Sequence, residues 1–490
     1  MGINKVEAVI FDLDDTLVST SKLEEYRKSN DRDGLERNLD KSRIFQPVHT
    51  ILEEIANKGI KLALVTNSPR WYVDKLLSYH QINVFETIIA YDDVGATGIK
   101  PSPYGINLAL EKLGITNPNR CIYIGDQASD FNAAYSANVK PVAPCWATRH
   151  AIEQVPAAII NSETLIDSLD DYDKIGLIAD QVAFHRSLNF PKKQLNFAPL
   201  NEDGNIVPLD KDKIKLITFG RYFSQGSELT ARYHETHKLS QDIYAKELSE
   251  TYVIPQYWVD LIEKVVSSLP LYFLKNENSY FDIITVIPSK KGKNKRLENL
   301  LKRVEALSDS KSSFVTDIFE FKDGAKSLKT LGGKDARKRE LELNLFLKDK
   351  YKNCLNGKSI LVIDDVITTG STFNRAFEIL NTENAAISIG VSIAKTVSIR
   401  DENKICPKCN SVMKVRLNKK TNIHFWGCSA FFETGNRKCN YSEPIKIKEC
   451  PICGKDMVMQ YNPKNGSSFL TCSSYRTASQ CGHTECVSEI

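Results

Sequence analysis

Carboxylate pairs suited to phosphoryl transfer stand near the N-terminus, each directly after an apolar run. Asp12 and Asp14 follow the run Val6–Phe11, and Asp126 and Asp130 follow a second such run. Carboxylates two residues apart at the end of a strand can face a common cleft as the chain leaves the sheet. Oxygen ligands of this kind are the ones that Mg²⁺ prefers. The spacing therefore indicates an acidic cleft that suits such a cation.

A hydroxyl and a lysine complete this candidate site. Thr66 and Asn67 end the apolar run that begins at Lys61, and Lys100 lies in a rigid proline loop, 98–103. Hydroxyl and cationic donors stabilise the charge on a phosphoryl group during its transfer. We therefore expect Thr66 and Lys100 at the same cleft as the carboxylates.

Alternating strands and helices must position these side chains. Amphipathic helical stretches lie between the short apolar strands, at roughly 48–57, 70–79, 104–113 and 130–137. Such alternation implies a parallel sheet that helices cover on both faces. Ligands bind open parallel sheets at the carboxyl ends of the strands, which is where the polar residues stand.

The motifs Asp-x-Asp-x-Thr, Thr-Asn, Lys-Pro and Gly-Asp-x-x-x-Asp, in this order, resemble the haloacid-dehalogenase superfamily of phosphatases over about residues 5–165. The resemblance implies a Rossmann-like parallel sheet, with Asp12 as the nucleophile and Asp14 as general acid and base. Thr66 and Lys100 would hold the phosphoryl oxygens. The implied Mg²⁺ set is Asp12, Asp14 through its backbone carbonyl, Asp126, and Asp130, which would orient Lys100 or a metal-bound water.

The space for a substrate-covering cap is small. Asp12 and Thr66 are separated by 66 − 12 − 1 = 53 residues, and about half of them must form a helix and a strand. This leaves roughly 19–41, a short charged segment, and no room for a second cap between Thr66 and Lys100. We expect an open cleft that tolerates a bulky phosphoester, such as a nucleotide or a polynucleotide end.

A second phosphate-binding pattern lies at 359–376. The apolar strand Ile360–Ile363 ends in Asp364 and Asp365, and a turn of small and hydroxyl residues then opens a helix near Phe373. Backbone N–H groups at such a helix start cradle a phosphate, and adjacent carboxylates suit the hydroxyls of a ribose. The Gly-Lys-Ser/Thr ending of a Walker A loop is missing. The turn consists of Thr368, Thr369, Gly370, Ser371 and Thr372.

This string resembles the ribose-phosphate signature of type I phosphoribosyltransferases, in a layout most similar to their ComF-like branch, over about residues 213–398. The resemblance implies that Asp364 and Asp365 bind the ribose hydroxyls of phosphoribosyl diphosphate (PRPP) and that 368–372 holds its 5′-phosphate. Lys290 or Lys291 would contact the diphosphate, with Mg²⁺ bridging, and 326–340 would form the catalytic flap. The acceptor base is not indicated.

Histidines precede this core. His234 and His237, three residues apart, lie in a segment that could form a hood over the acceptor pocket. They could bind a metal as a pair, but we favour a histidine pair on a helix surface.

Cysteines are concentrated at the C-terminal end. Nine of the twelve lie within the last 85 residues, and two Cys-x₂-Cys pairs repeat at a period of 44. Such spacing predicts two Cys₄ zinc sites, whose metal supplies much of the folding energy. For the second site His483 and Cys486 compete with Cys481, which we prefer. The predicted ligands are Cys406, Cys409, Cys428 and Cys439 for the first zinc, and Cys450, Cys453, Cys472 and Cys481 for the second.

The cysteine pattern with its aromatic residues resembles the C-terminal zinc ribbons of type IA topoisomerases, which bind single-stranded DNA. Exposed rings could stack on bases, although we expect about half of them to fill the ribbon cores. Because each Zn²⁺(Cys⁻)₄ centre carries −2, binding would depend on stacking and on local Lys and Arg. Candidate rings are Trp426, Phe431, Phe432, Phe469 and Tyr475, and candidate cations are Lys414, Arg416, Lys419 and Lys420.

The overall composition conceals parts of unlike charge. The chain has 490 residues and a net charge of 65 − 61 = +4, but 1–170 carries 17 − 23 = −6, 286–339 carries 15 − 7 = +8, and 401–490 carries 13 − 8 = +5. We expect a cytoplasmic, multidomain α/β protein without a membrane span or signal peptide. The expected parts are a phosphatase at 1–172, a linker at 173–212, a transferase at 213–398, and zinc ribbons of β structure at 404–445 and 446–490.

These parts predict an Mg²⁺-dependent phosphatase fused to a PRPP-binding transferase. It would act on nucleotides or nucleic-acid ends, and the ribbons would hold single-stranded DNA or RNA. One alternative is a nucleotide-salvage enzyme that binds no nucleic acid. Another is a nucleic-acid-binding sensor or effector of a stress-response or antiphage defence system, with a degenerate transferase. The oligomeric state is left open.

Overall fold

The computed structural model describes most of the chain. The described residues form two compact units, one from Met1–Phe223 with His234–Ile399 and the other from Ser224–Tyr233 with Arg400–Ile490. Within them, no helix combines the length and apolar character that a bilayer crossing requires. The described ranges are 4–147, 151–185, 196–210, 212–248, 251–274, 280–325, 334–399, 406–409, 411, 413–418, 420–421, 423–433, 438–475 and 481–486.

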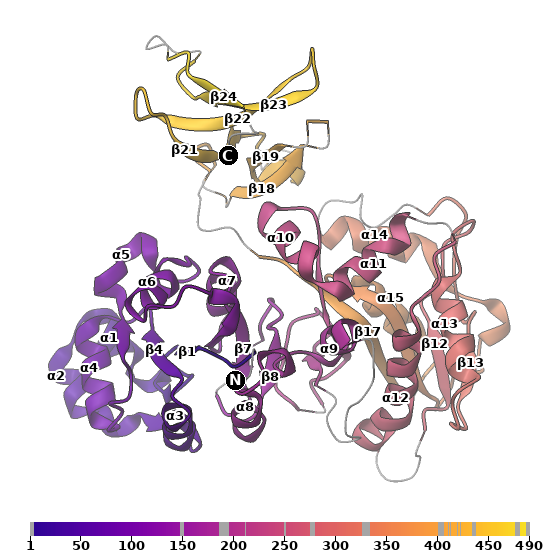
Figure 1. The fold of residues 1–490 in the computed structure, drawn as a ribbon. Helices are drawn as coiled ribbons and strands as arrows, with labels where there is room; N and C mark the ends of the chain where they lie inside the picture. Colours follow the sequence, from indigo (N-terminus) through magenta and orange to yellow (C-terminus); the bar gives the residue numbers. More distant parts are fainter. Residues whose placement is uncertain are drawn as a thin grey trace. The chain divides into compact units, whose positions relative to one another are not determined.

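A parallel sheet with the strand order β5-β4-β1-β6-β7-β8 forms the centre of the N-terminal part (Figure 1). In β1, Phe11 lies level with Leu64 of β4 on one side and with Ile124 of β6 on the other. The carboxyl ends of these three strands therefore meet at one edge of the sheet. The strands are β1 (Ala8–Phe11), β4 (Lys61–Val65), β5 (Thr87–Ile89), β6 (Cys121–Ile124), β7 (Lys140–Pro144) and β8 (Ala158–Ile160).

Helices cover both faces of this sheet. Val9 and Phe11 of β1 belong to one hydrophobic cluster, whereas Ala8 and Ile10 belong to another. Successive side chains of a strand point to opposite faces, so the wholly apolar β1 requires a core on each side. The helices are α3 (Val48–Asn57), α4 (Arg70–Tyr79), α5 (Tyr91–Gly98), α6 (Tyr104–Lys112), α7 (Ala128–Ser136) and α8 (Ser162–Ser168).

A short helical insert follows β1, at the position expected for a cap. Its ends are held by the antiparallel pairing of β2 (Val18–Ser19) with β3 (Arg43–Ile44). Leu23, Leu35 and Leu39 are buried and anchor the insert in the same hydrophobic cluster as Phe11. The insert contains the 3₁₀ turns η1 (Ser21–Leu23) and η2 (Leu39–Lys41) and the helices α1 (Glu24–Ser29) and α2 (Arg32–Arg37).

A second sheet has the order β13-β12-β16-β17-β10-β9, with β11 also paired to β17. Its strands are parallel except β9, which runs antiparallel to β10. The strands are β9 (Ala198–Leu200), β10 (Leu216–Thr218), β11 (Arg221–Phe223), β12 (Ile283–Val286), β13 (Ser313–Val315), β16 (Ser359–Ile367) and β17 (Ile387–Val397).

Helices and a separate hairpin surround this second sheet. The largest fully buried side chain is Trp258, which packs among residues of β10, β12, β16 and β17. The helices are α9 (Ile178–His185), α10 (Glu228–Thr236), α11 (Lys238–Leu248), α12 (Gln256–Phe273), α13 (Arg296–Glu305), α14 (Lys334–Asn344) and α15 (Ser371–Thr382), and the hairpin is β14 (Phe319–Phe321) with β15 (Leu345–Leu347).

The segment 173–212, which the sequence suggests is a linker, contains ordered elements of this second sheet. In α9, Ile178, Ala179 and Val182 are buried in the hydrophobic cluster around Trp258. The N–H of Ala179 donates to the carbonyl of Phe219 at 2.7 Å. β9 adds a strand at the edge of the sheet. Short apolar pieces between polar residues thus give this segment its own place in a core.

Small antiparallel sheets make up the C-terminal part. Each has a core of little more than cysteines and one or two apolar residues, such as Met413 in the first and Met457 and Leu470 in the second. Such cores are too small to be stable alone. The first sheet has β18 (Met413–Asn418), β19 (Ile423–Cys428) and β20 (Ser442–Pro444), and the second has β21 (Lys446–Glu449), β22 (Asp456–Asn462), β23 (Ser467–Cys472) and β24 (Thr484–Cys486).

Candidate active sites and metal centres

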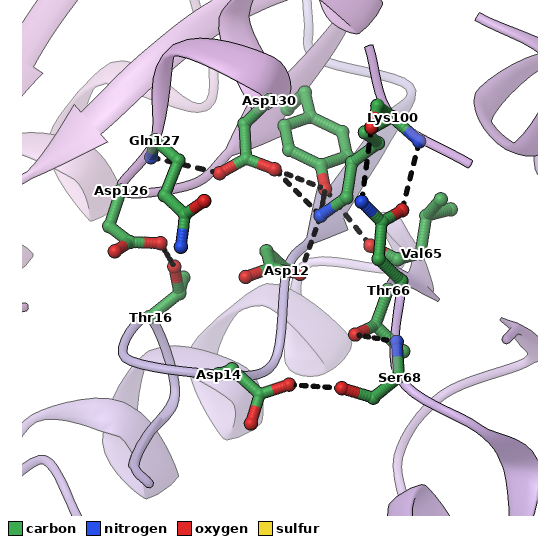
Figure 2. A network of polar contacts seen from close by, with 12 residues as sticks. Asp12, Asp14, Thr16, Val65, Thr66, Ser68, Lys100, Asp126, Gln127 and Asp130 are labelled. Atoms are coloured by element: carbon green, nitrogen blue, oxygen red, sulfur yellow. Dashed lines mark hydrogen bonds and ion pairs between the residues drawn. The ribbon is translucent and has the colours of Figure 1, made fainter. Parts of the chain in front are cut away.

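Lys100 lies at the centre of the polar cluster at the carboxyl ends of β1, β4 and β6 (Figure 2). Its Nζ is 2.6 Å from an oxygen of Asp12 and 2.6 Å from an oxygen of Asp130. Nζ also donates to the hydroxyl of Tyr123 at 2.8 Å, and that hydroxyl donates to the carbonyl of Val65 at 2.9 Å. The structure thus brings Asp12, Lys100 and Asp130 together, and Lys100 is held on several sides.

The Thr-Asn pair after β4 places the lysine loop. The side-chain amide of Asn67 donates to the carbonyl of Lys100 at 3.1 Å and accepts from its N–H at 2.9 Å. Thr66 is buried, and its hydroxyl accepts from the N–H of Ser68 at 3.2 Å. Figure 2 shows Thr66 on the same side of the cluster as Ser68 and Asp14.

The carboxylates of Asp12, Asp126 and Asp130 fit a divalent cation. One oxygen of each lies within 4.8 Å of the others. Among the described residues, Oδ2 of Asp126 is buried without a hydrogen-bond partner, while Oδ1 accepts from Thr16 at 3.2 Å. Such a buried orphan oxygen requires compensation, and a hard cation with oxygen ligands supplies it.

Burial makes the ionised forms of these acids costly. Burial, partly offset by Lys100, raises the pKa of Asp12 to about 7. Burial, and then the charges of Asp130 and Asp12, raises the pKa of Asp126 to about 9. A cation bound among the carboxylates would favour their charged forms and lower both values.

Asp14 points away from this cluster and is surrounded by donors. Its carboxylate accepts from Thr20 at 2.6 Å, Tyr72 at 2.9 Å and Ser68 at 2.5 Å. Arg27 of the insert completes this set, with its Nη1 2.8 Å from Oδ2 of Asp14. The side chain of Asp14 is therefore not part of the metal cluster, and only its backbone carbonyl remains as the predicted ligand.

Sequence reasoning missed several residues of this site. Tyr123 lies inside an apolar strand, where a tyrosine is ordinarily read as core. Arg27 lies in a charged helix with no distinguishing pattern. Ser68 directly follows the Thr-Asn pair and could have been found by extending that motif.

The second predicted site also forms a cavity. β16 continues to Ile367, beyond the apolar run, so Asp364 and Asp365 lie within the strand. The turn 368–370 leads into α15, and Gly370 at its N-cap has a φ of 72°. A cavity of about 520 Å³ is lined by the whole turn 368–372 together with Asp364, Asp365 and Lys290. This volume is in the usual range of a small-molecule site.

Basic side chains from other elements enter this cavity. Oδ2 of Asp365 is 2.7 Å from Nζ of Lys246 and 2.8 Å from Nε of Arg296. Burial opposes ionisation of Asp365, but these ion pairs outweigh it and lower its pKa. Burial, and then the adjacent Asp365, raises the pKa of Asp364 to about 7. Lys293 and Arg337 also line the cavity, which therefore suits a polyanion.

The two lysines that were predicted to contact the diphosphate lie in different surroundings. Lys290 lines the cavity, with its Nζ 5.2 Å from the ring centre of Phe321. Lys291 is exposed and pairs with Asp323. Part of the predicted flap, 326–333, lies outside the described residues. Arg296 belongs to the basic run 290–296 and could have been singled out from sequence, but Lys246 carries no such signal.

The histidines are not a surface pair, contrary to expectation. His234 is only 5% exposed, and its Nδ1 is 2.8 Å from the carbonyl oxygen of Phe223. Nδ1 of His237 is 2.8 Å from Ser240 Oγ, and its Nε2 is 3.2 Å from Asp180. His234 is buried, and the side chain of His237 is 13% exposed. The two rings contact different partners, because α11, which follows them, packs against α9 and β11.

The C-terminal cysteines form clusters with zinc-site geometry. Among the described residues, the sulfurs of Cys406, Cys409, Cys428 and Cys439 lie within 4.8 Å of one another, and so do those of Cys450, Cys453, Cys472 and Cys481. The measured sulfur separations are 3.3–3.7 Å. Four thiolates around Zn²⁺ lie roughly 3.8 Å apart, whereas a disulfide requires about 2.0 Å. Zinc therefore fits both clusters.

Cys481 and His483, which compete for the second site, have different partners. Cys481 joins the cluster, while Nε2 of His483 is 2.9 Å from a carboxylate oxygen of Glu485. The side chain of Cys486 is outside the described set.

The candidate base-stacking rings divide between core and surface. Trp426 packs against the first ribbon core, whereas Phe431 and Tyr475 are 45% and 55% exposed. Arg416 and Lys438 lie over the ring of Phe431, at 5.7 and 5.6 Å from its centre. The side chains of Lys414, Lys419 and Phe432 are not among those described, and Phe469 is half-buried.

Family models match separate stretches of the chain. Residues 23–143 match haloacid dehalogenase-like hydrolases, residues 336–426 match the phosphoribosyl transferase domain, and residues 447–478 match the topoisomerase DNA binding C4 zinc finger. The predicted fusion of these kinds of domain, and its α/β fold class with small β ribbons, are confirmed.

Curated relatives match part of the chain. Phosphoglycolate phosphatase of Aliivibrio fischeri is 34% identical over 110 residues, 22% of this chain and 47% of that protein. Pyrophosphatase PpaX of Oceanobacillus iheyensis is 36% identical over 106 residues, 21% of this chain and 48% of that protein. This chain thus spans about half the length of each. Among solved structures, a HAD phosphatase from Thermococcus onnurineus is 24% identical and covers 28% of this chain and 85% of that one, with a TM-score of 0.24.

Proposed function

We propose that the N-terminal part is an Mg²⁺-dependent phosphatase of phosphoric monoesters. The observation that carries this proposal is the buried cluster of Asp12, Asp126, Asp130 and Lys100 at the carboxyl ends of β1 and β6, with one carboxylate oxygen left without a partner. A bound Mg²⁺ would offset charge between these carboxylates and a phosphate.

The chain's own residues supply the remaining chemistry. Asp12 attacks phosphorus, and Lys100 and Thr66 hold the phosphoryl oxygens while the bond to the leaving oxygen breaks. Asp14 donates a proton to that oxygen and later accepts one from the water that hydrolyses the aspartyl-phosphate. Tyr123 and Asp130 keep the ammonium group of Lys100 directed at the site.

Phosphate release tests this function directly. The full chain with Mg²⁺ should release phosphate from p-nitrophenyl phosphate, and Asp12→Asn should abolish it. Asp33→Asn, which changes an exposed acid of α2, is the matched control and should retain activity. Absence of release from this ester and from a panel of nucleotides, phosphoglycolate and diphosphate would contradict the proposal.

We infer that the second cavity binds PRPP and transfers its ribose phosphate to an acceptor. The excess of Lys and Arg around Asp364 and Asp365, and the helix start at the turn 368–372, support this assignment. With PRPP and a panel of bases, the chain should release diphosphate, and Asp364→Asn with Asp365→Asn should stop it. Asp349→Asn, 91% exposed, is the control. Binding of PRPP without release would instead favour a sensor.

We also infer that the zinc ribbons bind single-stranded nucleic acid, so that the phosphatase acts on nucleotides or nucleic-acid ends. The exposed Phe431, with Arg416 and Lys438 near its ring, supports this role, since bases stack on such rings. A salvage enzyme has no use for such a surface, whereas a defence or stress effector does.

Oligonucleotide binding separates these readings. Labelled single-stranded DNA and RNA should bind the full chain in a salt-dependent way and should lose binding on deletion of 404–490. Phe431→Ala should weaken binding, while Tyr79→Ala, at an exposed ring of α4, should not. Equal weak binding by the full and shortened chains would favour the salvage function.

A further inference from the structure

Arg27 connects the insert to the catalytic cleft. Its Nη1 is 2.8 Å from Oδ2 of Asp14 and 2.8 Å from Oγ of Ser68, and its guanidinium carbon is 5.5 Å from the ring centre of Tyr72. The side chain of Arg27 is 26% exposed, whereas that of Asp14 is 13% exposed. The guanidinium therefore faces Asp14, and about a quarter of the Arg27 side chain is exposed at the edge of the cleft.

The basic residues of the insert differ in what they face. Lys28, next to Arg27, is 69% exposed and pairs with Glu24 within α1. Arg32 of α2 lies over the ring of Trp71, with its guanidinium carbon 5.3 Å from the ring centre. Among these three cations, only Arg27 contacts a residue of the cleft.

The position of Arg27 relative to the chemistry defines what it can touch. Lys100 is 5% exposed and enclosed by Asp12, Asp130 and Tyr123, so it serves the phosphoryl group that is transferred. Asp14 must instead meet the leaving oxygen in order to protonate it. A guanidinium 2.8 Å from Asp14 therefore lies beside the residue that meets the leaving group.

We propose that Arg27 is a specificity-determining residue that binds a second anionic group, a carboxylate or another phosphate, on the leaving group of the substrate. The inference rests on the proposed phosphatase function and narrows its substrate class. The substrate anion takes the place of Asp14 as the partner of Arg27. Asp14 is then free to hydrogen-bond the leaving oxygen.

Once Arg27 has turned to the substrate anion, Asp14 takes up a proton from solvent. The bond from phosphorus to the leaving oxygen breaks as the bond from phosphorus to Asp12 forms, and the proton of Asp14 passes to the leaving oxygen. The guanidinium suits this exchange because its planar fork binds carboxylate and phosphate equally well. When the ester has no second anion, Arg27 stays paired with Asp14, and the ester is hydrolysed less efficiently.

Matched ester pairs test the proposal on the full chain with Mg²⁺. Phosphoglycolate is compared with ethyl phosphate, and thymidine 3′,5′-bisphosphate with thymidine 5′-monophosphate, so that a carboxylate and a phosphate are assayed as separate arms. The wild type, Arg27→Ala, Arg27→Lys and the control Arg32→Ala are assayed for kcat and KM. p-Nitrophenyl phosphate reports on the phosphatase function itself.

We expect the wild type to prefer the doubly anionic ester of at least one pair by roughly tenfold or more in kcat/KM, through a lower KM. Arg27→Ala should bring this ratio close to one, Arg27→Lys should restore part of it, and Arg32→Ala should keep it. A preference that survives in Arg27→Ala, or no preference in either pair while p-nitrophenyl phosphate is hydrolysed, would overturn the inference. No hydrolysis of any ester would instead overturn the phosphatase function.

A folding defect in Arg27→Ala is distinguished by binding. In the Asp12→Asn background, phosphoglycolate should bind, and the additional Arg27→Lys change, which keeps the charge, should weaken binding less than Arg27→Ala does. Equal binding in all three backgrounds would contradict the proposed role.

Discussion

The ammonium group of Lys100 lies 2.6 Å from a carboxylate oxygen of Asp12, although the two residues are 88 positions apart in the chain. The parallel pairing of β1 with β4 makes this contact possible, because Asn67, just after β4, hydrogen-bonds the backbone of Lys100 and holds it at the end of β1. A buried cation between two carboxylates offsets charge that the core could not otherwise hold.

Removal of Lys100 should affect chemistry more than removal of the hydroxyl that supports it. Lys100→Met should lower phosphate release by about 100-fold or more, because a donor to the transferring phosphoryl group is lost. Tyr123→Phe should lower the free energy of unfolding by about 1–2 kcal/mol, since Lys100 and the Val65 carbonyl both lose a partner. Steady-state kinetics and urea titrations measure these effects. If Tyr79→Phe, at an exposed ring, lost as much activity as Lys100→Met, the result would contradict this account.

The buried pair of Arg221 and Asp180 should be important for stability. Its atoms Nε and Oδ2 are 2.7 Å apart, and both side chains are largely buried. Arg221→Met leaves Asp180 in the core without the guanidinium that pairs with it, so the free energy of unfolding should fall by about 3–5 kcal/mol. Lys75→Met breaks an exposed pair with Glu36 and should change stability by about 1 kcal/mol or less. Equal losses in both variants would show that burial is irrelevant here.

The same pair predicts a pH dependence. Burial opposes ionisation of Asp180, but Arg221 and His237 outweigh it and lower its pKa from 3.8 to about 2. A carboxyl with a lowered folded-state pKa contributes stability above its unfolded pKa and loses it as the pH falls toward the folded value. The difference in unfolding free energy between wild type and Arg221→Met should therefore be full near pH 7 and smaller near pH 3. A difference that grows on acidification would contradict this assignment.

Gly370 should be essential to the phosphate-binding turn. Its φ is +72°, and a Cβ atom there would lie 2.5 Å from the carbonyl oxygen of Glu202. Gly370→Ala should weaken PRPP binding by about tenfold or more, because the backbone must shift. Gly357→Ala is the matched control, since Gly357 has a φ of +70° and no described atom within 4 Å of the added Cβ. Gly357→Ala should lower the free energy of unfolding by about 1–2 kcal/mol, which is the cost of backbone strain, and should leave PRPP binding unchanged. Calorimetric titration with PRPP distinguishes the two.

Zinc content should follow the cysteine clusters. Elemental analysis should find about two zinc ions per chain in the wild type and about one in Cys428→Ser, as expected for closed Cys₄ sites. Cys354→Ser, at an exposed cysteine outside the clusters, should retain both. Chelation should unfold 406–486 while the phosphatase activity persists, because the ribbon cores depend on metal. Retention of two ions in Cys428→Ser would refute the ligand set.

Sequence patterns predicted the parts of these sites that stand next to a periodic element. Asp12, Thr66 and Asp126 each follow an apolar strand, so the rule that ligands bind at strand ends was enough to bring them together. The cysteines were predictable because metal ligation fixes their spacing.

Other site residues have no local signature because their partners are distant in the chain. Arg27 reaches Asp14 from a helix whose charges look like those of any solvated face, and Lys246 reaches Asp365 across 119 positions. The contact of His237 with Asp180 likewise depends on packing against α9, which lies in a stretch whose polar residues suggest a linker. Contacts between residues that are far apart in the chain decide the partners of these side chains. The helical or strand periodicity of the sequence does not encode such contacts.

The place of α9 and β9 in the second sheet has a practical consequence for fragments of this protein. A transferase fragment begun at residue 213 would leave β10 as an unpaired edge and would uncover Phe219 and Leu239, which pack with Ala179. Exposed edges and apolar patches of this kind promote aggregation. Expression of the transferase alone should therefore begin before Ile178, so that the fragment brings its own edge strand and covering helix.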